Sequence, residues 1–170
     1  HLQYGIGLRV QGNRIAYRPD AAADLTVHDD WDVSPSLSLL WMINEARKIS
    51  ATLAYIKAIE DIPYSALTPY REYTGEHSYT TGNPDLVSPK SHTLTAAIDL
   101  FDRLSFNALY IHNERPIYYA TRVDPALPSV TYTKPMNAQN ERLFGFSAEA
   151  RFDPLPWWKL KGMVMYTLFG

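Results

Sequence analysis

The sequence of 170 residues contains no cysteine. This absence excludes disulfide bonds, thiolate catalysis and zinc sites built on cysteine. An excess of charge of one sign is also lacking, because 16 Lys and Arg stand against 18 Asp and Glu, for a formal net charge of -2. The balance excludes a strongly basic nucleic-acid-binding protein and an acidic disordered tail.

Long hydrophobic runs are missing as well. The longest, from Leu37 to Ile43, is interrupted by Ser38 and is far shorter than the ~20 residues that a membrane-spanning helix needs. The mean hydropathy of -0.26 is also unlike that of a helical membrane protein. The chain begins at His1 and stops within an apolar stretch, so we expect it to be a piece of a longer protein.

Apolar and polar residues alternate along much of the chain. In the stretch from Leu2 to Gln11 every second residue is apolar, and successive side chains of a strand point to opposite faces. The alternation recurs often enough to predict an all-β, antiparallel up-and-down meander of about seven strands. We expect these strands within residues 2–11, 37–43, 49–55, 94–100, 104–110, 144–153 and 158–168.

The expected connections alternate between short and long. Short turns are predicted at 44–48, 101–103 and 153–156, and long polar loops at roughly 13–32, 65–92 and 119–142. Tight turns at one end and long loops at the other are typical of outer-membrane β-barrels, whereas a soluble sandwich spreads its loop lengths more evenly. About seven strands cannot close such a barrel, which needs an even number from about 8 upward. We therefore expect this sheet to pair with strands outside the sequence.

The two faces of the expected sheet differ in character. One face is apolar and is predicted to meet lipid; it carries Leu8, Leu39, Leu53, Ile98, Phe106, Phe146 and Val164. The other face is predicted to line the barrel lumen, where mixed charges stay hydrated or paired. Its charged residues are expected to be Arg9, Lys57, Asp99, Glu149, Arg151, Lys159 and Lys161. Aromatic residues such as Trp41, Tyr55, Tyr110 and Tyr166 suit the membrane interfaces.

A longer pattern carries a family resemblance. The pattern consists of residues 53–69, Tyr73 and residues 79–89. Its most distinctive element is Gly82-Asn83-Pro84-x-Leu86-x-x-Pro89. This stretch resembles TonB-dependent outer-membrane receptors of the Bacteroidetes type, in which a strand L-x-Y-S-R-R-I-x-R-P precedes a loop with G-N-P-x-L-x-P. Here the last proline comes one residue later, and Asp61-Ile62 replaces Arg-Pro. Similarity continues at 33–37, 136–137, 145–146 and 157–160, and so spans nearly the whole chain.

The resemblance implies a barrel of about 22 strands with a plugged lumen, which imports a nutrient with energy from the TonB complex. Residues 1–170 would be a later part of that barrel, without a plug domain, in the outer membrane of a Gram-negative bacterium. The nutrient would be a siderophore, glycan, cobalamin or peptide. The implied partners are outer-membrane lipid, the protein's own plug and remaining strands, the TonB complex and a surface lipoprotein. The alternative is a soluble or surface β-sheet domain that binds a ligand, lipocalin-like.

Signals of catalysis are absent from the sequence. The five His show no H-x-x-H or H-x-H spacing, and there is no G-x-S-x-G elbow, P-loop or G-x-G-x-x-G. We therefore expect no enzyme, no cofactor or metal site and no nucleic-acid partner. Tyr and Arg in the second long loop predict substrate contacts there. These residues are Tyr64, Tyr70, Arg71, Tyr73, His77 and Tyr79. A second candidate segment is 118–132; in either loop the tyrosines could instead pack against each other.

Overall fold

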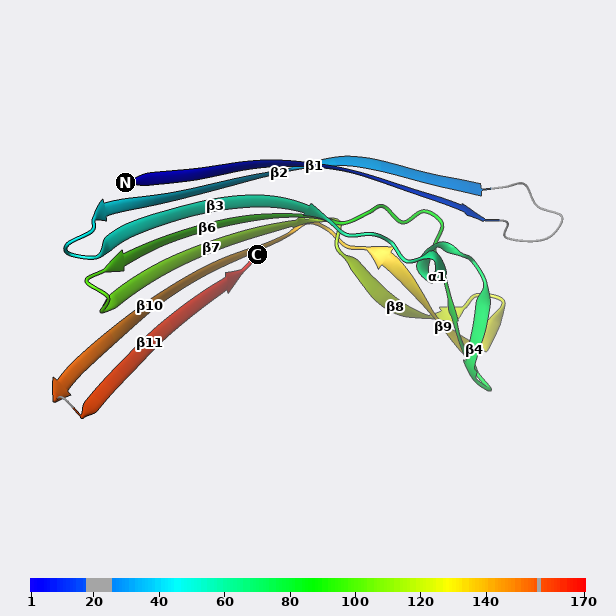
Figure 1. The fold of residues 1–170 in the computed structure, drawn as a ribbon. Coiled ribbons are helices and arrows are strands. Elements are labelled where there is room, and N and C mark those ends of the chain that lie inside the picture. The colour runs from blue at the N-terminus through cyan, green and yellow to red at the C-terminus, as the bar shows by residue number, and fades with distance from the viewer. Residues whose placement is uncertain (18–25, 156) are drawn as a thin grey trace.

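The chain folds into two β-sheets, of which the larger is an arched antiparallel sheet (Figure 1). The computed structural model describes residues 1–17, 26–155 and 157–170. The larger sheet has seven strands in the spatial order β1-β2-β3-β6-β7-β10-β11. Their bounds are β1 Leu2–Tyr17, β2 Thr26–Asn44, β3 Ile49–Ile59, β6 Lys90–Leu100, β7 Leu104–Glu114, β10 Glu141–Leu155 and β11 Trp158–Phe169.

The smaller sheet has four strands in the order β4-β5-β9-β8 and lies beyond one end of the larger sheet (Figure 1). In it β5 and β9 run parallel, whereas the two outer pairs are antiparallel. The bounds are β4 Arg71–Gly75, β5 Ser78–Thr81, β8 Ile117–Asp124 and β9 Leu127–Asn137, with the one-turn helix α1 Tyr64–Leu67 before β4. No helix among the described residues is long and apolar enough to cross a membrane.

The predicted meander of seven strands is confirmed, and every predicted stretch lies inside one strand of the larger sheet. The alternation fixes these strands because a one-residue slip would move all apolar side chains to the other face. β3, β6 and β7 have 11 residues each, which matches the ~9–11 residues of a tilted membrane-spanning strand.

The short turns gather at one end of the larger sheet, as predicted, and the long connections at the other (Figure 1). Backbone hydrogen bonds join neighbouring segments at this end: Phe101 N donates to Lys48 O of the preceding turn over 3.0 Å, and Arg151 N of β10 donates to Arg103 O over 2.7 Å. Phe101 and Asp102 both have positive φ, 58° and 55°, the left-handed backbone that tight hairpin turns use. The third turn is shorter than expected, because β10 continues to Leu155.

The strand register confirms that the apolar residues share one face. One row of directly opposed residues across the sheet consists of Tyr4, Leu39, Leu53, Ala96, Ala108, Phe146 and Tyr166. Described protein atoms do not cover this face, since Phe146 is 42% exposed and Val164 is 71% exposed. An apolar face of this extent marks a surface that meets lipid or another apolar partner.

The opposite face carries the polar set, with one correction. The register puts Arg9, Thr52, Asp99, Asn107, Glu149 and Lys161 on that face. The prediction for Lys57 was wrong, because Lys57 follows Leu53 and Tyr55 in steps of two and lies directly opposite His92. Lys57 therefore belongs to the apolar face, at the end where the long connections begin.

The three predicted long loops were wrong in part, because strands occupy much of them. In the first, β1 continues to Tyr17 and β2 begins at Thr26; the remainder, 18–25, lies outside the described residues. The other two contain α1 and the whole smaller sheet. Within each loop the strands form a local hairpin, β4–β5 and β8–β9. The parallel pairing of β5 with β9 joins the two loops, and such a contact between distant segments leaves no local periodic signal.

The buried core of the described chain lies at this same end. Ile62, Ala66, Leu67 and Leu86 form it, and Ile15 and Ile117 pack against it from β1 and β8. Among the described residues, no hydrophobic side chain of the larger sheet is buried. The molecule thus combines an uncovered sheet with a small, protein-packed cap.

Candidate functional site

The long connections assemble into one structure, which we call the loop domain: α1, β4, β5, β8, β9 and the segment 82–89. Its centre is the motif that carries the family resemblance. Gly82 N donates to Thr68 O over 3.1 Å, and Asn83 N donates to Ala66 O over 2.6 Å. A Cβ at Gly82 would lie 2.3 Å from Thr68 O, so only glycine fits against this backbone.

Asparagine side chains join the motif to the β8–β9 hairpin. The Asn83 Nδ2 donates to Pro135 O over 3.0 Å. Asn137 of β9 links the hairpin back to the segment 82–89. Its Oδ1 accepts from Val87 N over 2.9 Å, and its Nδ2 donates to Val87 O and Arg115 O, each over 2.8 Å. Leu86 fills the core below with 1% of its surface exposed. Amide side chains that make several hydrogen bonds to the backbone of a distant segment hold that segment in one arrangement.

Tyr79 is the aromatic centre of the smaller sheet. Its ring stacks on Tyr132 with centroids 5.7 Å apart and lies 5.8 Å from the ring of Tyr73. The Arg71 guanidinium carbon stands 4.9 Å from its ring centroid, a cation–π arrangement. The Tyr79 hydroxyl donates to Asp124 Oδ2 over 2.8 Å, and the residue is 6% exposed.

The same hydrogen bond shifts two titrations in opposite directions. The bond to Asp124, together with burial, raises the pKa of Tyr79 above its ordinary value. The backbone N–H of Ala126 and the Tyr79 hydroxyl hold the pKa of Asp124 below its ordinary value. Each group is thereby kept in the protonation state that the pair requires, with a neutral phenol and an ionised carboxylate.

The six predicted substrate residues lie in two groups, with His77 apart from both. Tyr64 and Tyr70 line a hollow of about 550 Å³. Arg71, Tyr73 and Tyr79 form the aromatic cluster on the other side of the smaller sheet. His77 lies in the turn before β5, where its carbonyl accepts from Thr131 N over 2.9 Å. Whether these residues contact substrate stays a prediction.

The hollow also contains residues that the sequence did not single out together. Its lining is Tyr64, Ser65, Ala66, Thr68, Tyr70, Glu72, Thr80, Thr81, Gly82, Tyr119, Thr133 and Pro135. Tyr119 belongs to the second candidate segment, and the register of β8 and β9 brings it here, opposite Pro135. Glu72 was missed because a single glutamate in a polar loop carries no pattern of its own.

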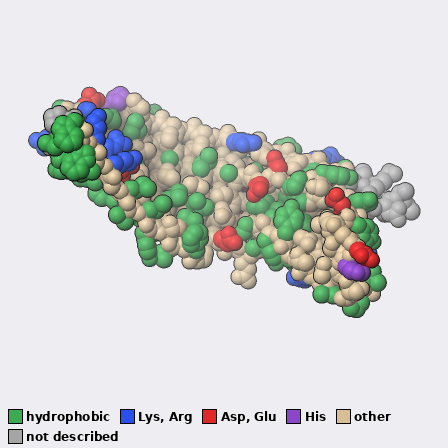
Figure 2. Space-filling view, turned by 90° about the horizontal axis from the view of Figure 1, so that it is seen from below, with side chains coloured by type: hydrophobic (Ala, Val, Ile, Leu, Met, Phe, Trp, Pro, Cys, Tyr) green, Lys and Arg blue, Asp and Glu red, His purple; other side chains and the backbone are tan. Residues whose placement is uncertain are grey.

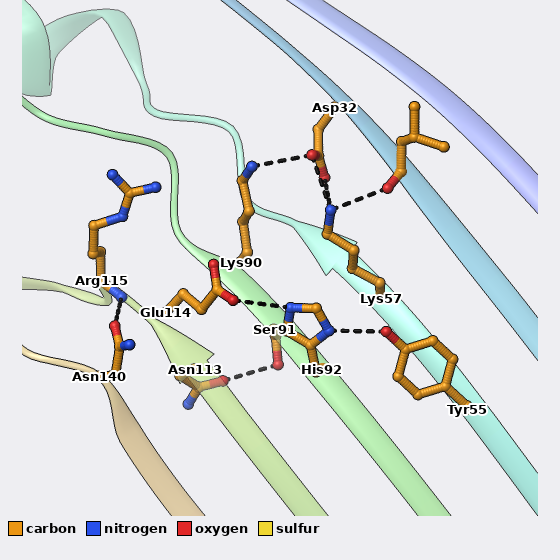
Figure 3. A network of polar contacts seen from close by, with 11 residues as sticks. Asp32, Tyr55, Lys57, Lys90, Ser91, His92, Asn113, Glu114, Arg115 and Asn140 are labelled. Carbon is orange, nitrogen blue, oxygen red and sulfur yellow. Dashed lines mark hydrogen bonds and ion pairs between the residues drawn. The ribbon is translucent and has the colours of Figure 1, made fainter.

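A polar belt ends the apolar face on the side of the loop domain (Figure 3). Lys57 Nζ lies 2.8 Å from Asp32 Oδ2, and Lys90 Nζ lies 3.0 Å from Asp32 Oδ1, so one carboxylate holds two ammonium groups. His92 shares a hydrogen bond of 2.9 Å with the Tyr55 hydroxyl, and its Nε2 lies 3.3 Å from Glu114 Oε1. These ties join β2, β3, β6 and β7.

At the turn end, charges cluster on the polar face. Glu149 is paired with Arg151 and with Lys161, each over 3.0 Å, and Ser105 Oγ donates to Asp99 Oδ1 over 2.6 Å. Asp99, Ser105, Glu149 and Arg151, with residues of the nearby turns, line an open hollow of about 480 Å³. Figure 2 shows Lys and Arg side chains gathered at this end of one face. Arg9 lies apart from this cluster, on β1 opposite Ser34.

The fold and its two faces define an outer-membrane β-barrel protein. The chain belongs to the outer membrane protein beta-barrel family, whose model matches residues 1–169. It is accordingly a protein of the Gram-negative outer membrane. No curated protein matches it in sequence.

A solved structure is similar to this chain: the siderophore receptor PirA from Pseudomonas aeruginosa, with a TM-score of 0.67 and 16% sequence identity. The match covers 98% of this chain and 34% of that receptor, so the chain spans about a third of the receptor's length. At this identity the likeness shows the fold, which is an all-β wall like that of an outer-membrane receptor. Among the described residues, no group of three or more His, Asp or Glu side chains could hold a metal ion.

Proposed function

We propose that this chain is part of the barrel wall and outer loops of a TonB-dependent receptor that imports a nutrient across the outer membrane. The observation that carries the proposal is the seven-stranded sheet with one uncovered apolar face, which ends at the polar belt and continues into the folded loop domain. A lumen-facing polar side and a lipid-facing apolar side are what a barrel wall requires.

The edges of the sheet support a larger barrel. β1 and β11 are its outermost strands, and each has one strand neighbour among the described residues. Open edges are not tolerated in hydrocarbon, since each unpaired backbone group there costs several kcal/mol. In the proposal, further strands complete a barrel of about 22 strands. A plug domain would then meet the polar face, including Arg9 and the cluster around Glu149.

The remaining partners follow from the same proposal. The TonB complex would supply energy, and a surface lipoprotein would contact the loop domain from outside. The Bacteroidetes type rests on the Gly82–Pro89 motif, and the nutrient would be a siderophore, glycan, cobalamin or peptide. No catalytic step is part of the function. The soluble, lipocalin-like alternative is set aside, because the chain belongs to an outer-membrane family.

Single cysteines in a cysteine-free background test the lipid-facing side, and residues 1–170 contain no cysteine of their own. A fluorophore on Phe146→Cys, in the protein reconstituted into vesicles, should be quenched by brominated lipid. The same label on Ser147→Cys, the adjacent residue on the opposite face, should be quenched by a soluble quencher instead. Equal accessibility of both labels to the soluble quencher would contradict the membrane wall.

Import is tested in cells that carry the protein as their only route for a given nutrient. Uptake of one ferric siderophore, oligosaccharide, cobalamin or peptide should require both the protein and an intact TonB complex. Uptake that persists without the TonB complex would show a passive pore and overturn the proposed function.

A further inference from the structure

The hollow in the loop domain has the size and the walls of a ligand site. Its volume of about 550 Å³ lies within the range of small-molecule pockets. Tyr64 from α1, Tyr70 before β4 and Tyr119 from β8 line it, and all three side chains are exposed. Exposed tyrosines around a concave surface offer flat apolar rings together with hydroxyl groups.

The floor of the hollow is rigid. Gly82 lies in it, and the hydrogen bonds to Thr68 and Ala66 fix that backbone. The Thr68 hydroxyl donates to Tyr64 O over 2.9 Å, and the hydroxyls of Thr121 and Thr133 share a hydrogen bond of 2.9 Å. A preformed floor lowers the conformational entropy that a ligand must overcome on binding.

Other polar groups in the hollow are not used by the protein. Glu72 lies directly opposite Thr80 on the neighbouring strand. Within the described chain, neither side chain has a hydrogen-bond or ion-pair partner. A carboxylate that accepts and a hydroxyl that both donates and accepts are therefore available to a ligand.

The charge of the lining selects among ligands. Of the described residues that line the hollow, Glu72 is the one with a formal charge, and Lys and Arg are absent. The nearby Arg71 points to the opposite face, where its guanidinium lies over Tyr79. Anions such as phosphates or catecholate chelates would meet a carboxylate here without a cation to offset it, which is unfavourable.

We propose that this hollow binds an uncharged, hydroxyl-rich ligand of oligosaccharide size. The tyrosine rings would stack on the C–H faces of the sugar rings, while Glu72 and Thr80 would bond to the sugar hydroxyls. The assignment rests on the proposed import function and names the substrate class for it.

The test uses the full-length protein in lipid nanodiscs, probed with an array of neutral and acidic oligosaccharides and titrated with each ligand that binds. At least one neutral oligosaccharide should bind. Tyr70→Ala and Tyr119→Ala should each weaken that binding about tenfold or more, whereas Tyr119→Phe should retain most of it. Tyr4→Ala is the control, because Tyr4 is an exposed tyrosine of β1 that does not line the hollow; it should leave the affinity unchanged.

The change in affinity caused by Glu72→Gln distinguishes neutral, cationic and anionic ligands. For a neutral sugar the amide still accepts a hydrogen bond, so affinity should fall only a few-fold, with little dependence on salt. A loss of tenfold or more that depends on salt would show a cationic ligand, and a gain in affinity would show an anionic one; either result overturns the assignment. The absence of any neutral oligosaccharide among the ligands would overturn it too.

The two proposals fail separately. Energised uptake of a siderophore, with no binding of neutral sugars, would leave the import function standing and refute the sugar site. Sugar binding that depends on Tyr119, without uptake driven by the TonB complex, would support the site and refute import.

Discussion

The larger sheet and the loop domain solve the problem of apolar surface in opposite ways. The larger sheet leaves its apolar residues uncovered, so that Leu53 is 38% exposed, whereas the loop domain encloses Leu86 to 1% exposure. In the sheet, lipid takes the place of a protein core. In the loop domain, which stands beyond the end of the apolar face, the protein has to supply the core itself. The difference explains why one region is regular and the other is compact and irregular.

A leucine truncation in each region sharpens the comparison most. Leu86→Ala should destabilise the loop domain by about 2–5 kcal/mol, because removing a fully buried side chain leaves a cavity. Leu53→Ala should cost less, because fluid lipid fills the space and no cavity term is added. Amide hydrogen exchange of β5 and β9, and urea unfolding of the protein in vesicles, measure the two effects. Equal costs at both sites would break the comparison.

Arginine substitutions test the lipid contact along one face. Phe146→Arg should cost ~2–4 kcal/mol if that position faces the middle of the bilayer. Leu160→Arg lies close to the stacked pair Trp157 and Trp158, where the guanidinium can reach the headgroups, and should cost about 0–1 kcal/mol.

Ser147→Arg, on the opposite face, is the control in the same refolding titrations into vesicles and should have little effect. Large and equal penalties at 146 and 160 would indicate a protein-covered face instead of lipid.

Glycine at position 82 is expected to be required by the loop domain alone. Gly82→Ala places a Cβ against the Thr68 carbonyl and should cost about 1–3 kcal/mol through overpacking. Hydrogen exchange should rise in α1 and β5 and remain unchanged in β3 and β6. Gly162→Ala is a suitable control, because nothing lies within 4 Å of a Cβ built there. An effect that spreads through the larger sheet would show that the two regions unfold as one.

The smallest effect is a pH dependence confined to the loop domain. Because the pKa of Asp124 is lowered in the folded state, its ionised form contributes stability above the ordinary carboxyl pKa, about 4, and this is lost as pH falls through the folded value. Because the pKa of Tyr79 is raised, its contribution is complete below about pH 10 and is lost as pH rises through the folded value.

Exchange in β5 and β9, corrected for the intrinsic rate at each pH, should therefore be flat near neutrality and rise at both extremes. Asp124→Asn should remove the rise in acid. A rise in acid of the same size in that variant would assign the effect to other carboxylates.

The sequence alone determined the strands of the larger sheet and their two faces, because side-chain alternation is a local property of extended backbone. Leu53, Phe146 and Asp99 could be assigned to faces by counting in steps of two. The same count also places Lys57 with Leu53. The sequence therefore contained the correct face of Lys57, and its assignment to the polar face was a mistake in applying the alternation.

Tertiary structure decided how the long loops fold. The parallel pairing of β5 with β9 joins segments about fifty residues apart, as Tyr79 and Tyr132 illustrate. Sequence reasoning found Tyr64 and Tyr70 as candidate ligand contacts. It could not join them to Tyr119 and Glu72 in one hollow, or show that Tyr79 packs against Tyr132 and Asp124. Such contacts depend on which distant segments close on each other around a shared core, and the energy that selects them comes from burial and hydrogen bonds formed only after closure.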